Sequence, residues 1–279
     1  MRNGFSVDVE DWYHGIELPV ESWPNYEKRI RFSMGALLEL LQARGVRVTC
    51  FVLGRLAEEH PDLVKQIHRA GHEIATHGYS HAKVYELTPA RFRSELRHSI
   101  ALLEDLTGQR VIGHRAPYFT ITRKSWWALD ILSEEGILYD SSIYPVRNLR
   151  YGIPDAHRLP SYLPLKNGLR ILEIPVSTLP LPRFNLPLGG GAYLRIYPYW
   201  FLRQCLKHLE SRREKINLYI HPWELDPLHP VIPLPFRVSA THYVNLRSTQ
   251  SKLESLFLDF KFAPYQEVYR EWLEPVKNK

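Results

Sequence analysis

The chain alternates between two hydrophobic patterns. Short apolar runs, such as FSVDVE (5–10) and VRVTCFVLG (46–54), are typical of buried strands. Between them, apolar residues recur at helical spacing. In SMGALLELLQAR (33–44), Ser33 stands at the expected N-cap and Gly45 follows the end of the pattern. We therefore expect strands and helices to alternate from the start of the chain.

The alternation continues along the sequence. Further helices are expected at 60–71, 88–108, 123–135 and near 198–213, and further strands at 72–77, 111–117, 137–142, 169–177 and 216–224. Strands separated by helices form parallel sheets, and so many steps favour a deformed (β/α)7-type barrel over a small open sheet. A helix around 246–259 and a last short helix follow. We expect a barrel over 1–225 and a C-terminal helical extension over 226–279 packed on it.

Composition narrows the class of protein. The 279 residues are 44% hydrophobic and 24% charged, which suits a globular domain with a full core. The net charge of +6 comes without a long basic run, so we expect no nucleic-acid partner, although a polyanionic or lipid-phosphate partner stays open.

Cys50 and Cys205 lie far apart among apolar residues and are expected to be buried thiols, which fits a reducing compartment. The N-terminus has no apolar signal region and no apolar stretch is long enough to span a membrane, so we expect a cytoplasmic protein without a transmembrane segment.

Polar residues of a few types follow the expected strands. In an α/β barrel these positions meet at one face, where the chemistry takes place. The residues concerned are Asp8, Glu10 and Asp11, then His77 and His81, then His114 and Arg115, then Tyr139 and Asp140, and finally His221, Trp223 and Glu224. Two neutral imidazoles and a carboxylate are a common face for a divalent metal. A second carboxylate can take a proton from water and a protonated histidine can give one to a leaving nitrogen, so the set suits amide hydrolysis.

Each of these residues also has a structural interpretation. The chain has 13 histidines, so an H-x-x-x-H pair can arise by chance. The acids after the first strand could cap a helix or lie in a solvated turn, Arg115 could form a supporting ion pair, and Trp223 could be core packing. We take His14, His68, His72 and His98 as structural or surface groups.

The order of the motifs carries a resemblance. D-x-E-D, H-G-Y-S-H, R-A-P-Y, Y-D-S-S and H-P-W-E occur in the order found in the polysaccharide deacetylases, the NodB-like family 4 carbohydrate esterases. The stretch TCFVLGRLAEEHPDLVKQIHRAGHEIATHGYSH (49–81) resembles the second motif of that family and its lead-in. GGGAYLRIYPYW (189–200) and FRVSATHYVNLRSTQSKLESLFLDFKF (236–262) are similar to a subgroup from bacterial exopolysaccharide and exosortase loci that has a C-terminal extension.

The resemblance implies a role for individual residues. His77 and His81 would be metal ligands on a loop after a strand, Asp8 the general base, Arg115 the residue that keeps that base charged and oriented, and His221 the proton donor. Pro117, Tyr118 and Trp223 would shape the groove for a sugar ring. Asp140 matches the fourth motif only loosely.

The first motif departs from the family pattern. The family commonly has two adjacent aspartates, whereas this chain has D-V-E-D. We expect Asp11 to bind the ion, with Glu10 as the alternative third ligand. An alignment shifted by two residues would instead make Glu10 the base and Asp11 the ligand.

The sequence therefore predicts an N-deacetylase that depends on a divalent metal ion, with zinc as the first choice. Its substrate would be a polysaccharide containing N-acetylhexosamine, or a lipid-linked or nucleotide-linked precursor, in exopolysaccharide biosynthesis. Two alternatives stay open: an amidase or deformylase acting on a small molecule such as a ureide, and a barrel that binds glycans without turnover.

Overall fold

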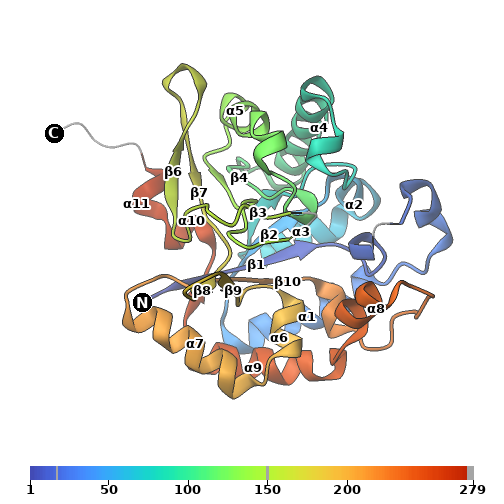
Figure 1. Cartoon of the computed structure of the whole chain (residues 1–279). Coiled ribbons are helices and arrows are strands. Elements are labelled where there is room, and N and C mark those ends of the chain that lie inside the picture. The colour runs from blue at the N-terminus through green and yellow to red at the C-terminus, as the bar shows by residue number, and fades with distance from the viewer. Residues whose placement is uncertain (17, 149–150, 275–279) are drawn as a thin grey trace.

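A curled, nine-stranded sheet forms the centre of the computed structural model, which describes residues 1–16, 18–148 and 151–274. Eight of its strands run in the order β10-β1-β2-β3-β4-β5-β7-β6, and the ninth, β11 (Phe262–Ala263), pairs with β1 beside this path (Figure 1). The parallel strands are β1 (Asn3–Val9), β2 (Thr49–Val52), β3 (Glu73–Thr76), β4 (Gly113–His114), β5 (Tyr139–Asp140), β7 (Arg170–Glu173) and β10 (Asn217–Ile220). Because they are parallel, their carboxyl ends meet at one side of the molecule.

Three further strand segments lie outside the predicted pattern. β6 (Ser161–Pro164) pairs antiparallel with β7 at one edge, and β8 (Thr178–Pro180) forms a separate hairpin with β9 (Asn185–Pro187). The chain after β7 reaches back to β10, where the backbone N–H of Ser177 donates to the carbonyl of Asn217 at 2.9 Å. The predicted deformed (β/α)7-type barrel is therefore confirmed.

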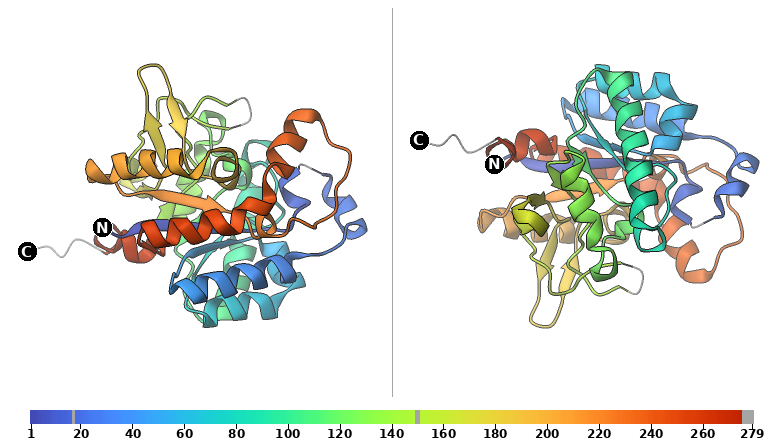
Figure 2. Two further views of the ribbon diagram at one scale, coloured as in Figure 1. Left: turned by 90° about the horizontal axis from the view of Figure 1, so that it is seen from below. Right: turned by 90° about the horizontal axis from the view of Figure 1, so that it is seen from above.

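Helices surround the sheet. They are α1 (Ile30–Arg44), α2 (Gly54–Glu59), α3 (Pro61–Arg69), α4 (Pro89–Thr107), α5 (Trp127–Glu134), α6 (Gly191–Ile196), α7 (Tyr199–Ser211), α8 (Phe236–Tyr243), α9 (Thr249–Asp259), α10 (Tyr265–Val268) and α11 (Arg270–Leu273). The two views of Figure 2 show α4 and α5 on one side of the sheet and α7 and α9 on the other. The short helices α2, α6 and α8 have no counterpart in the sequence prediction.

The ends of two helices show how well local signals work. Helix α4 begins and ends as predicted, because the Thr88 hydroxyl accepts the N–H of Arg91, Pro89 opens the first turn and Gly108 ends it with φ +68°. Helix α1 begins at Ile30, three residues before the predicted cap at Ser33. Its first turn is capped by Asp11, which follows β1 and accepts the N–H groups of Arg29 and Ile30. A cap from so far away in the sequence leaves no local pattern.

The C-terminal segment is part of the central sheet. Strand β11 (Phe262–Ala263) pairs parallel with the start of β1, and the Phe262 ring lies 5.3 Å from the ring of Phe5. The domain boundary at residue 225 stays a prediction. Cys50 and Cys205 are buried and unpaired, as expected. In the part of the chain that the structure describes, no helix combines the length and apolar character that crossing a membrane requires.

Candidate metal centre and active site

Three side chains converge where β1 and β3 end. The Nε2 atoms of His77 and His81 lie 2.7 and 2.8 Å from the same oxygen, Oε1 of Glu10. One ligand atom from each of the three residues can be chosen so that all lie within 4.8 Å of one another. All three side chains are buried.

The local backbone fixes the direction of both imidazoles. Nδ1 of His77 lies 2.8 Å from the carbonyl of Arg115 and donates to it, so in the neutral imidazole Nε2 keeps the lone pair with which a cation can be bound. His81 has a left-handed backbone with φ +59°, and Tyr118 and Phe119 next to it have φ +53° and +57°. Non-glycine residues adopt this conformation at a cost of about 1–3 kcal/mol each, and such residues gather at functional sites.

The three residues fit a divalent cation. Oε2 of Glu10 and Nδ1 of His81 are buried and have no hydrogen-bond partner among the described residues. Burial by itself raises the pKa of Glu10, but His81 and His77 outweigh it and hold that pKa well below its usual range. Two imidazoles and an ionised carboxylate with open sides form a ligand set that zinc and related ions use.

Asp11, the preferred ligand in the sequence analysis, points elsewhere. One oxygen of its carboxylate accepts the N–H of Trp12, and the other accepts the N–H groups of Arg29 and Ile30 at 2.8 and 3.0 Å. Asp11 therefore caps the start of α1, and the structure corrects the assignment of the third ligand in favour of Glu10. Alternation along an extended chain explains the difference, because residue 10 shares the side of residue 8 and residue 11 does not.

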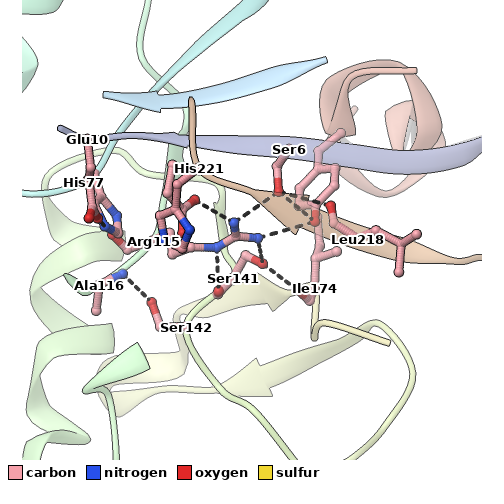
Figure 3. A network of polar contacts seen from close by, with 12 residues as sticks. Ser6, Glu10, His77, Arg115, Ala116, Ser141, Ser142, Ile174, Leu218 and His221 are labelled. Atoms are coloured by element: carbon pink, nitrogen blue, oxygen red, sulfur yellow. Dashed lines mark hydrogen bonds and ion pairs between the residues drawn. The ribbon is translucent and has the colours of Figure 1, made fainter. Parts of the chain in front are cut away.

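Asp8 is held by a buried arginine. Nη1 of Arg115 donates to Oδ1 of Asp8 at 2.6 Å, and the guanidinium has no exposed surface. Its remaining donors reach Ser6, Ser141 and Tyr265 (Figure 3). Burial lowers the pKa of Arg115, but Asp8 outweighs this effect and the pKa rises, so the pair stays ionic. The sequence analysis named Asp8 and Arg115 but missed their supports, although Ser6 lies two residues before Asp8 on the same side of β1.

His221 directly follows β10, so it lies at the carboxyl ends of the parallel strands, as Glu10 and Asp8 do. In the view of Figure 3 it lies between the Glu10–His77 pair and the Arg115 guanidinium. Its Nδ1 is 2.9 Å from Oε1 of Glu224, and the side chain is 20% exposed. Burial lowers the pKa of His221, but the hydrogen bond to Glu224 and the charges of Glu10 and Asp8 outweigh it and raise the pKa to about 9. At neutral pH the imidazole therefore carries a proton that it can donate.

The three residues expected to contact a sugar differ in exposure. Tyr118 is half-buried, and its ring lies 4.5 Å from that of His81 while its hydroxyl donates to the carbonyl of His14. Pro117 is buried. Trp223 is only 4% exposed and stacks between the rings of His221 and His242. The rings stacked on Trp223 leave it little surface for a sugar, and the role of Pro117, Tyr118 and Trp223 in shaping the groove stays a prediction.

Asp140 belongs to a separate network. Its carboxylate lies 2.7 Å from Nδ1 of His114 and accepts the hydroxyl of Ser142. Glu224, not Asp140, is the acid beside His221.

The fold and the site define a class of protein: a curled α/β barrel with a two-histidine, one-carboxylate site at the carboxyl ends of its strands. Residues 27–134 match the family model described as Polysaccharide deacetylase, and residues 141–270 match a domain of unknown function, DUF3473. The first match confirms the resemblance to the NodB-like polysaccharide deacetylases seen in the motifs, and the exopolysaccharide subgroup stays a prediction.

Individual relatives agree with this family. The chain is 37% identical over 115 residues to peptidoglycan deacetylase-like protein FGM2 of Gibberella zeae, a match that covers 40% of this chain and 33% of the relative. It is 32% identical over 112 residues to a peptidoglycan deacetylase of Helicobacter pylori, covering 38% and 36%. The matches thus span about a third of either relative.

Solved structures share the fold over nearly the whole chain. A putative polysaccharide deacetylase from Mycobacterium smegmatis has a TM-score of 0.65 at 21% identity, covering 99% of this chain and 92% of that one. Puue allantoinase has the same TM-score at 17% identity, covering 99% and 91%. Likeness at this level concerns the fold and does not select a substrate.

Proposed function

We propose that this protein is a metal-dependent hydrolase that removes N-acetyl groups from a glycan containing N-acetylhexosamine. The observation that carries the proposal is the meeting of Glu10, His77 and His81 at the strand ends that also bear the Asp8–Arg115 pair and His221. The relatives named as peptidoglycan deacetylases support this class of substrate. The polymer or its lipid-linked or nucleotide-linked precursor, in exopolysaccharide biosynthesis, is the finer form of the same proposal.

Glu10, His77 and His81 would hold the metal ion, with zinc as the first choice. An ion bound there polarises an amide carbonyl and lowers the pKa of water. The chain supplies a preorganised ligand set for it, since the His77 ring is fixed by the carbonyl of Arg115 and the two Nε2 atoms already face one carboxylate.

Asp8 would act as the general base. Its carboxylate, oriented by the 2.6 Å contact with Arg115, would accept a proton from the water molecule that attacks the acetamide carbon. The buried guanidinium also prevents the carboxylate from turning away, which fixes the direction in which the proton is accepted.

His221 would act as the general acid. With its pKa raised to about 9, the imidazole is protonated at neutral pH and can give that proton to the nitrogen as the amide bond breaks. Acetate then leaves, and the sugar keeps a free amine. Tyr118, whose ring contacts His81, would border the substrate.

The test is a measurement of metal content and of acetate release. Purified protein loaded with zinc should release acetate from N-acetylglucosamine oligomers or peptidoglycan fragments. Glu10→Ala should lose both the metal and the activity, whereas Glu58→Gln, which removes a surface carboxylate paired with His98, should keep both.

The substrate panel also separates the alternatives. Hydrolysis of allantoin or a formamide without acetate release would replace the proposal by a small-molecule amidase. Glycan binding without turnover, with or without metal, would replace it by a binding barrel. Absence of bound zinc, manganese, cobalt and nickel in the intact protein would contradict the metal site itself.

A further inference from the structure

We propose that Arg195 and Glu224 form a buried ionic chain that positions His221 for proton transfer, and that the backbone at 241–244 holds Arg195 in place. The inference rests on the proposed role of His221 as the general acid. It gives a function to the C-terminal half of the chain, which matches a domain of unknown function and contains all of these residues. Arg195 is then a positioning residue, because it acts through Glu224.

Glu224 connects Arg195 to His221. It has no exposed surface, and its Oε1 accepts the backbone N–H of His221 and lies 2.9 Å from the ring Nδ1 of the same residue. Its Oε2 accepts Nε of Arg195 at 2.7 Å. Both oxygens are therefore used, and the carboxylate cannot rotate without breaking a contact on either side. Because Nδ1 donates to Glu224, Nε2 of His221 is the nitrogen that can face a substrate.

Arg195 is held on its other side by main-chain carbonyls. Nη1 donates to the carbonyls of His242 and Val244 at 3.1 and 2.6 Å, and Nη2 donates to that of Thr241 at 2.9 Å. The side chain is 1% exposed. A guanidinium can reach a carboxylate on one edge and several carbonyls on the other, which the single ammonium of lysine cannot do. The end of α8 is thereby tied to the acid beside His221.

The packing around Glu224 and His221 is close. A Cβ atom at Gly191, the first residue of α6, would lie 1.8 Å from each carboxylate oxygen of Glu224, so glycine is required there. The Trp223 ring stacks on His221 at 22° and on His242 at 25°, and Arg195 lies 5.5 Å from the centre of the same ring. His221 is thus fixed by a ring on its face and a carboxylate on its edge.

The charges around His221 also favour the ion pair with Glu224. The charged and titratable groups around His221 are Glu224 beside it, Tyr219 from β10 with its ring 5.6 Å away, Asp8 from β1, Glu10 just after β1, Arg195 from α6 and His242 from α8. Burial raises the pKa of Glu224, but Arg195 and His221 outweigh it and lower that pKa to about 2. Burial lowers the pKa of His242 to about 3, so this imidazole is neutral and adds no repulsion at neutral pH. Glu224 therefore stays negative next to the proton of His221.

The test follows the hydrogen bond itself, by proton NMR of histidine-labelled, metal-free protein. The wild type should show a downfield Nδ1–H signal that His221→Gln removes. Arg195→Met should remove or broaden this signal beyond detection, and Arg195→Lys should restore it only in part. Arg203→Met is the matched control, because it breaks an arginine–carboxylate pair with Asp259 at the surface of α7, and should leave the signal unchanged. An intact signal in folded Arg195→Met would overturn the inference.

Activity supplies a second, separate readout. Arg195→Met should lower kcat by about a hundredfold with little change in KM, since a misplaced catalytic group costs rate rather than binding. In a Glu224→Gln background the same substitution should cost much less, because its effect passes through Glu224. Equal losses in both backgrounds would contradict the positioning role. If the wild type proves inactive on every glycan, the NMR experiment still decides the inference.

Discussion

At the scale of single residues, the first motif decides which acid does what. D-V-E-D contains three carboxylates within four residues, and the structure gives each a different neighbour: Arg115 for Asp8, two imidazoles for Glu10, and the first turn of α1 for Asp11. One position along an extended chain turns a side chain to the other side, so neighbouring acids of similar chemistry enter different environments.

A pair of substitutions tests this division. Glu10→Gln should lose bound zinc, because the ligand set loses its only negative charge. Asp11→Asn should keep the zinc but lower the free energy of unfolding by about 1 kcal/mol, the usual value of a helix cap. Elemental analysis and denaturant unfolding measure the two effects. Zinc lost from Asp11→Asn and retained in Glu10→Gln would reverse the assignment.

The role of Asp8 is tested apart from the metal. Asp8→Asn should retain zinc while kcat falls by roughly 10²–10⁴, the contribution typical of a general base. Buried Arg115 loses its counter-charge in this variant, so it should also unfold at lower denaturant concentration. The rates are therefore compared at a temperature where circular dichroism shows the variant folded. Full activity there would rule Asp8 out as the base.

The pH dependence of His221 has a definite sign. The pKa of His221 in the folded chain, about 9, exceeds its ordinary value, so the proton it holds stabilises the fold below the unfolded pKa and this contribution disappears as the pH rises through about 9. Activity that needs the protonated acid should fall over the same range. Zinc adds positive charge nearby and should therefore lower the pKa of His221. The zinc-loaded protein should lose activity at a lower pH than the pH at which His221 titrates by NMR in the metal-free protein. If the residual activity of His221→Gln still fell over the same alkaline range, His221 would not be the general acid.

At the scale of elements, polar pairs join strands that have little other contact. Strands β4 and β5 are two residues each, and His114 and Asp140 join them through their side chains. Glu173 at the end of β7 extends this network: its Oε1 accepts the N–H of Ile143, while burial and the charge of Asp140 raise its pKa well above the usual range. The folded chain therefore favours the protonated form of Glu173 over the ionised one.

This network predicts a stability that falls with rising pH. The folded chain keeps the proton of Glu173 where the unfolded chain has lost it, so the stability falls as the pH rises above the unfolded pKa of about 4.3. Glu173→Gln keeps a donor toward Asp140 and cannot ionise. We expect it to raise the free energy of unfolding at pH 8 more than at pH 5, by urea denaturation at both values. An equal effect at the two pH values would show that Glu173 is ionised in the folded chain.

At the scale of the whole molecule, the C-terminal half completes both the sheet and the active site. Strand β11 pairs with β1, the Tyr265 hydroxyl on α10 accepts Nη2 of Arg115, and Glu224 holds His221. We therefore expect one cooperative unfolding transition for the described parts of both halves rather than two.

The packing of Phe262 tests this expectation. Phe262 is 8% exposed and contacts the rings of Phe5 and Phe257, so Phe262→Ala should cost about 3–5 kcal/mol of stability. Leu258→Ala is the control, because this leucine is 73% exposed and its loss should cost less than about 0.5 kcal/mol. Both are measured by denaturant unfolding with one probe in each half. Separate transitions for the two probes would contradict a single unit.

Sequence reasoning predicted the long elements because their signals are local. The Thr88 cap, Pro89 and Gly108 bound α4, and apolar runs marked β1, β2 and β10. It missed α2, α6 and α8, which have few turns and gain their stability from packing. It also placed the start of α1 three residues late, because Asp11 caps that helix from a distant strand.

The amino-acid sequence by itself determined the alternation of strands and helices, the barrel class and the set of residue types at the strand ends, because periodicity and motif order are properties of the chain. The tertiary structure decided which carboxylate joins His77 and His81, that Trp223 stacks on His221 and His242, and that Arg195 reaches Glu224. These outcomes depend on the direction of side chains and on contacts between segments far apart in the chain, which local patterns do not encode.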